Sequence, residues 1–81
     1  MNETILEQVS RWLGEGRKVA IATVIETWGS APQPVGSQLV IDSEGNFAGS
    51  VSGGCVEGAV VTEAIEVIGS GKPKTLSFGV A

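Results

Sequence analysis

The sequence predicts a small α/β (α+β) domain, with two helices and a mixed sheet of about four strands in the order helix, strand, hairpin, helix, strand. Three observations lead to this class. Two segments carry apolar residues at helical spacing, a β-branched apolar run lies between them, and a turn-rich stretch separates two further short apolar runs. Eighty-one residues suffice for one domain, so we expect a single unit over residues 1–81.

The first helix is predicted over residues 3–14. Its apolar residues recur at helical spacing and form one stripe: Ile5, Leu6, Val9, Trp12 and Leu13. Asn2 is the expected N-cap, and Gly14 and Gly16 are stop signals. We expect Trp12, on this stripe, to belong to the core rather than to a ligand site.

The strands are predicted from composition and punctuation. Residues 18–27 are a nearly continuous β-branched apolar run, typical of a strand covered on both faces. The Gly- and Pro-rich residues 28–36 are too irregular for a strand. Residues 37–42 and 47–51 are the next two strands, and the turn sequence at 42–46 joins them as a hairpin.

The period of the pattern changes after the glycine pair at positions 53 and 54. Apolar residues then fall on one helical face: Val56, Ala59, Val60, Ala64, Val67 and Ile68. Gly69-Ser70-Gly71 and then Pro73 mark the end of this second helix. Residues 75–80 are predicted to form the fourth strand.

Composition excludes several classes of function. Nine acidic and five basic residues give a net charge of −4, which argues against binding to nucleic acid or to an anionic membrane. No apolar run approaches the roughly 20 residues that span a bilayer. The acidic N-terminus is no secretory signal, and a single cysteine fits a reducing compartment, so we expect a cytoplasmic protein. A chain of 81 residues buries only a thin core, which favours a homo-oligomer or docking onto a larger partner.

The Gly-rich turn at residues 50–57 is the candidate site. Helix N-termini offer unpaired N–H groups and partial positive charge, and glycines let a ligand approach the backbone. Gly53 and Gly54, with the hydroxyls of Ser50 and Ser52, therefore resemble the parts of a cradle for phosphate or another oxyanion. The alternative is a tight turn in which the two glycines only adopt positive φ.

The turn also holds Cys55 and Glu57. The helix dipole favours a thiolate at Cys55, whereas the carboxylate of Glu57 disfavours a second negative charge. Cys55 is thus either a functional thiol or a small buried side chain; with no histidine in the chain, a Cys–His enzyme is excluded. Glu57 is either a capping carboxylate at the third helical position, with Gly54 as N-cap, or a ligand contact.

The Pro-rich loop from Thr27 to Gly36 leaves the first predicted strand. Pro32 and Pro34 restrict its backbone, so it is either a rigid wall beside a site or a stiff connection.

Two long motifs, residues 24–36 and 49–58, closely resemble the N-terminal domain of the XdhC/CoxI family, and Phe78-Gly79-Val80 is similar to that family's next landmark. The resemblance covers nearly the whole chain. Members are accessory factors of xanthine dehydrogenase and of related molybdenum hydroxylases, such as carbon monoxide dehydrogenase. They commonly continue into a Rossmann-like domain, which we do not expect within these 81 residues.

The resemblance implies a maturation factor that binds the molybdenum cofactor (molybdopterin), aids its sulfuration or insertion and passes it to a target enzyme, without catalysing net turnover. It implies a phosphate held by the turn, with Cys55 near the molybdenum or its dithiolene. The implied cofactor-binding residues are Thr27, Gly29, Ser30, Ser50, Ser52, Gly53, Gly54, Cys55 and Glu57. Two alternatives stay open: a module for docking onto a dehydrogenase or a cysteine desulfurase without a ligand of its own, and a protein that carries persulfide sulfur on Cys55.

Overall fold

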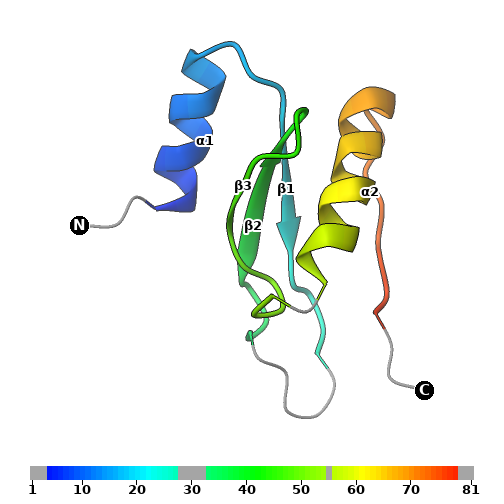
Figure 1. Ribbon diagram of the computed structural model, residues 1–81. Helices are drawn as coiled ribbons and strands as arrows, with labels where there is room; N and C mark the ends of the chain where they lie inside the picture. Colours follow the sequence, from blue (N-terminus) through cyan, green and yellow to red (C-terminus); the bar gives the residue numbers. More distant parts are fainter. Residues whose placement is uncertain (1–3, 28–32, 55, 79–81) are drawn as a thin grey trace.

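The computed structural model describes residues 4–27, 33–54 and 56–78. It shows two helices on opposite sides of a three-stranded antiparallel sheet (Figure 1). In chain order the elements are α1 (Ile5–Gly14), β1 (Val19–Thr23), β2 (Gln38–Asp42), β3 (Phe47–Gly49) and α2 (Glu57–Ser70). The predicted class and both predicted helices are confirmed.

The central strand β2 forms the core. Leu39 and Ile41 are fully buried and pack with Val60 and Ala64 of α2. Since side chains alternate along a strand, the equally buried Val40 points to the opposite face, the one that α1 covers. Burial on both faces thus belongs to β2.

The covered strand was predicted in the wrong place. We expected it over residues 18–27, but β1 stops at Thr23 and lies at the edge of the sheet, with 46% of Ile21 exposed. An edge strand has a neighbour on one side only, and although α2 contacts β1, α1 lies mainly against β2. The apolar composition of residues 18–27 predicted a strand there, but it did not predict the place of that strand in the sheet.

The hairpin between β2 and β3 is confirmed, with Val40 opposite Ala48. The third strand is shorter than the predicted 47–51, because the chain turns at Gly49 with a φ of +94°. A Cβ atom there would collide with the carbonyl oxygen of Gln38 and with the Ile5 side chain, so only glycine fits.

Helix α1 begins one residue after Thr4, whose hydroxyl accepts a hydrogen bond from the Glu7 amide at 3.1 Å. Thr4 is therefore the N-cap; the predicted cap, Asn2, lies outside the described residues. Trp12 is buried, as predicted, but Leu6 and Leu13 are 75% and 56% exposed. The helix turns about 100° per residue, which carries these two leucines off the narrow face that meets the sheet.

Helix α2 ends within the predicted stop sequence: Gly69 and Ser70 are still helical, and Gly71 adopts the left-handed conformation (φ +72°) and donates to the carbonyl of Val67. The expected fourth strand is not formed by residues 75–78, and residues 79 and 80 lie outside the described part. Residues 72–78 instead run alongside α2 (Figure 1), where Lys74 pairs with Glu63 and Glu66. The described strands are all antiparallel, not of mixed direction.

Candidate functional site

The candidate residues gather at one end of the sheet. In an antiparallel sheet of order β1-β2-β3, strands β1 and β3 end on the same side, and α2 begins there too (Figure 1). Thr27 closes the described segment after β1, and Ser50 follows β3 directly. Gly29, Ser30 and Cys55 lie outside the described residues, so the structure assigns them no contacts.

The centre of the turn is the carboxylate of Glu57, which is only 6% exposed. Its Oε2 atom accepts hydrogen bonds from the Ser50 hydroxyl (2.6 Å) and from the amides of Val51 (3.0 Å) and Ser52 (3.1 Å). Its Oε1 atom accepts from the Gly54 amide (2.9 Å) and from the Ser52 hydroxyl. Five donors from one short segment thus converge on one side chain.

The two serine hydroxyls also accept hydrogen bonds. Ser50 Oγ accepts from the Gly53 amide and Ser52 Oγ accepts from the Val56 amide, both at 2.9 Å. Every described N–H from Val51 to Val56 therefore donates within the turn. The protein's own side chains therefore hold these five amides.

Hydrogen bonding keeps Glu57 ionised. The hydroxyl of Ser50 and then that of Ser52 lower its pKa most, and the amides of Val51 and Ser52 lower it further. Burial raises the pKa, but by less than the donors lower it, so the pKa lies well below its usual range. All five described donors are uncharged. Glu57 is thus a fixed anion at neutral pH and not a proton donor.

The helix starts later than expected. We placed the N-cap at Gly54 and Glu57 at the third helical position; the structure has Val56 as N-cap and Glu57 as the first helical residue. Val56 supplies no capping side chain, so the Glu57 side chain folds back over the turn to accept from Gly54. The described contacts of Glu57 reach the turn before the helix, so they differ from the predicted capping contact, and the predicted ligand contact stays a prediction.

The glycine pair is the open part of the turn. Gly53 and Gly54 adopt φ values of +69° and +105°, as the tight-turn alternative requires, and both are exposed. Around Gly54 an added Cβ atom would meet nothing within 4 Å, so a ligand can approach its backbone from solvent. Binding of a ligand at the nine candidate residues stays a prediction.

A second carboxylate cluster, at the other end of the sheet, was missed in the sequence. Asp42 accepts from the amides of Glu44 and Asn46, from the Asn46 side chain and from the Arg17 guanidinium, all at 2.9 Å. Burial raises the pKa of Asp42, but the bonds from Asn46, Glu44 and Arg17 together lower it below its usual value. An Asp four residues before an Asn in a turn sequence was the available signal.

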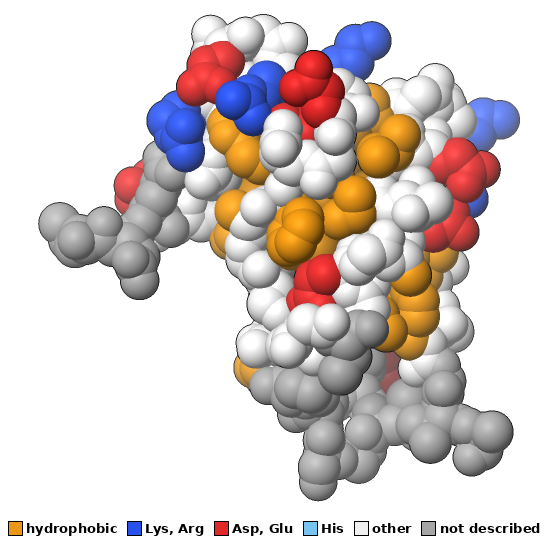
Figure 2. Space-filling view, viewed as in Figure 1, with side chains coloured by type: hydrophobic (Ala, Val, Ile, Leu, Met, Phe, Trp, Pro, Cys, Tyr) orange, Lys and Arg blue, Asp and Glu red, His pale blue; other side chains and the backbone are white. Residues whose placement is uncertain are grey.

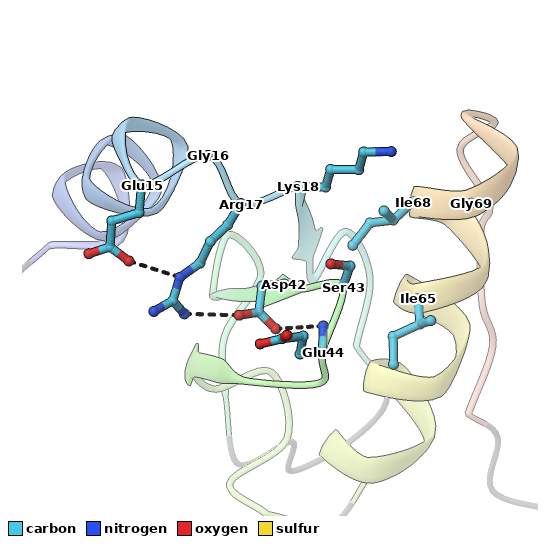
Figure 3. A pocket seen from close by; sticks show the side chains of 10 residues that line it. All are labelled: Glu15, Gly16, Arg17, Lys18, Asp42, Ser43, Glu44, Ile65, Ile68 and Gly69. Atoms are coloured by element: carbon cyan, nitrogen blue, oxygen red, sulfur yellow. Dashed lines mark hydrogen bonds and ion pairs between the residues drawn. The ribbon is translucent and has the colours of Figure 1, made fainter.

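This cluster borders a groove of about 580 Å³ between the hairpin turn, the start of β1 and α2 (Figure 3). Arg17 bridges Glu15 and Asp42 there and lies 5.0 Å from the Trp12 ring centroid. Glu44 adds a third carboxylate, and Lys18 is the other cation. The excess of acid at this groove argues against an anionic ligand.

Apolar side chains also reach the surface. Figure 2 shows them gathered on the face between the two helices. Phe47 of β3 and Ile65 of α2 are among the exposed apolar residues. This exposure accords with the thin core expected for so short a chain.

The described residues contain neither a metal-binding cluster nor a membrane-spanning helix. In residues 4–27, 33–54 and 56–78, no three His, Cys, Asp or Glu side chains are grouped as a metal ion would need. No helix in the same part of the chain has the length and apolar character to cross a bilayer.

Comparison with known proteins supplies what the geometry alone does not. The sequence model described as "XdhC and CoxI family" matches residues 12–79. Over 78 residues the chain is 38% identical to the molybdenum cofactor insertion chaperone PaoD of Escherichia coli (strain K12). The aligned region is 96% of this chain but 24% of that relative, so the chain spans about a quarter of the relative's length.

Proposed function

The chain belongs to the XdhC and CoxI family, and from this premise we propose that it binds the molybdenum cofactor and takes part in the maturation of molybdenum enzymes. The observation that carries the proposal is that the chain is 38% identical to a molybdenum cofactor insertion chaperone over 96% of its own length. The cofactor is cargo in this role, which is to hold and deliver it, so the protein acts as a chaperone and not as an enzyme.

We place the cargo at the end of the sheet where β1 and β3 end. The exposed backbone of Gly53 and Gly54 supports this placement, because a planar group can come close to it. Cys55 follows directly and offers the soft sulfur that suits molybdenum. The remaining proposed contacts are Thr27, Gly29, Ser30, Ser50 and Ser52, and Glu57 belongs to the site as the acceptor that holds its turn.

The finer parts of the proposal concern partners. We propose that the target is a hydroxylase of the xanthine dehydrogenase or carbon monoxide dehydrogenase type, that sulfuration brings in a cysteine desulfurase, and that the protein acts in the cytoplasm. We further propose that residues 1–81 form one domain that associates with a second copy.

The test is cofactor retention by protein purified from a molybdenum-replete host. The wild-type protein is expected to retain cofactor, measured as molybdenum by mass spectrometry and as pterin fluorescence after oxidation. Cys55→Ser is expected to lower retention at least tenfold. Ser43→Ala, an exposed change at the opposite end of the sheet, is the matched control. Retention by Cys55→Ser equal to that of the control would remove Cys55 from the site.

A second candidate function is protein docking without a bound ligand. The exposed apolar side chains favour it, among them Ile25 at 69%. Light scattering with and without cofactor separates the two functions. Tight assembly by protein that retains no cofactor supports docking, whereas cofactor retention, in a monomer or in a dimer, supports the chaperone.

A further inference from the structure

We infer that Glu57 is a positioning residue: its carboxylate is the resident anion of the turn, it fixes the backbone on both sides of Cys55, and it keeps anionic groups of a ligand away from the turn amides. This inference rests on the proposed function for its ligand, the molybdenum cofactor. It changes the part expected of Glu57 in the sequence from a ligand contact to a support of the site.

The carboxylate has little capacity left for a ligand. Two ionised oxygens offer about four lone-pair directions, and five donors already point at them. The side chain is also almost wholly buried. A ligand that bonded to Glu57 would have to replace donors that lie within the same eight residues.

The same geometry decides where a phosphate does not bind. The amides of Val51, Ser52 and Gly54 belong to the turn that precedes α2, and all three donate to Glu57. A phosphate in this place would have to displace a buried carboxylate, or lie beside a like charge. We therefore expect an uncharged or soft part of the ligand at these three amides, and we do not expect its phosphate to bind them.

Glu57 holds both chain neighbours of Cys55. The Gly54 amide donates to Glu57 directly. The Val56 amide donates to the Ser52 hydroxyl, which itself donates to Glu57. Loss of the carboxylate thus releases the backbone before and after the cysteine, while α2 keeps its packing through Val60 and Ala64.

The experiment replaces the carboxylate and then returns it from solution. In Glu57→Ala, amide hydrogen exchange at Val51, Ser52 and Gly54, followed by NMR, is expected to rise at least tenfold, and cofactor retention to fall at least tenfold. Sodium acetate is expected to reverse both, relative to sodium chloride of equal ionic strength. Glu66→Ala, which removes an equal charge from an exposed place on the same helix, is expected to change neither.

A separate arm uses inorganic phosphate on the wild-type protein. The amide signals of Val51, Ser52 and Gly54 are expected not to move as phosphate is added. Movement of these signals on saturation would show that phosphate displaces Glu57, and it would overturn the inference.

The other outcomes are equally decisive. Unchanged amide exchange in Glu57→Ala overturns the inference, whether or not cofactor retention is lost. The inference also fails if acetate restores slow exchange but not cofactor retention, since Glu57 would then contact the ligand itself. If Glu57→Ala does not fold, Ser50→Ala removes one donor to Oε2 and is measured in the same way. If the wild-type protein retains no cofactor, the proposed function fails, while exchange and the phosphate arm still decide whether Glu57 is the resident anion.

Discussion

Asp42 and Glu57 are two buried carboxylates at opposite ends of the same sheet, and they are stabilised in different ways. Asp42 closes the hairpin turn and has a cation, Arg17, among its four donors. Glu57 has five described donors, all of them uncharged amides and hydroxyls. Both groups have lowered pKa values, so both are ionised at neutral pH.

The difference separates a structural cluster from a candidate site. At Asp42 the charge is balanced and the donors come from two distant segments, so the cluster ties the start of β1 to the hairpin. At Glu57 the charge is held by local dipoles alone, and the donors shape one exposed glycine turn. The second arrangement fixes a backbone conformation that is open to solvent, which is what a binding turn needs.

The largest expected effect is that of Glu57→Gln. The amide nitrogen would face donors in place of an acceptor, and we expect the free energy of unfolding to fall by about 3 kcal/mol. Urea denaturation at pH 7 measures it, with the exposed Glu66→Gln as control. A loss below about 1 kcal/mol would mean that the five contacts are not maintained in solution.

Acid is expected to act next, with a sign set by the lowered pKa of each carboxyl group. Between pH 7 and pH 3 the unfolded chain takes up protons that folded Glu57 does not, so acid favours unfolding. With an unfolded pKa of about 4.3, the stability lost through Glu57 by pH 3 is about 2 kcal/mol. Urea midpoints across this range measure the loss, and Glu57→Gln should flatten the profile. An equal slope in the variant would contradict the assignment.

Arg17→Gln is expected to have the smallest effect, about 1 kcal/mol, since Arg17 is partly exposed and Asp42 keeps its three other donors. High salt should weaken the wild-type contact and narrow the difference between the two proteins. Unfolding midpoints at low and high sodium chloride measure this. A loss as large as that of Glu57→Gln would abolish the distinction between the two clusters.

Much of the fold was readable from local patterns. Helical spacing placed α1 and α2, and the turn residues placed the β2–β3 hairpin. The glycine-containing stop sequence also predicted the end of α2, which lies at Gly71. The errors concern neighbours: the strand predicted over residues 18–27 is the shorter edge strand β1 (Val19–Thr23), and residues 75–78 lie alongside α2 instead of entering the sheet. A strand-like composition indicates that a segment can form a strand. Whether it forms one, and where in the sheet, depends on the surface against which it packs.

The candidate site was readable in part. The positive φ of Gly53 and Gly54 belongs to one of the two interpretations that the sequence allowed, the tight turn. The saturation of Glu57 was not readable, because it depends on how a side chain one residue into a helix folds back over the turn. Residue spacing gives the candidates for such a contact but not the direction in which the carboxylate points.

By itself the sequence determined the family, the two helices, the hairpin and the position of the glycine turn, because these depend on short-range periodicity and on residues with distinctive backbone preferences. Tertiary structure alone decided that β2 and not β1 is covered on both faces. It also decided that the amides of Val51, Ser52 and Gly54 donate to Glu57. Burial and hydrogen-bond saturation are properties of the folded surroundings: the same side chain is a free acceptor or a filled one according to which donors the chain brings to it.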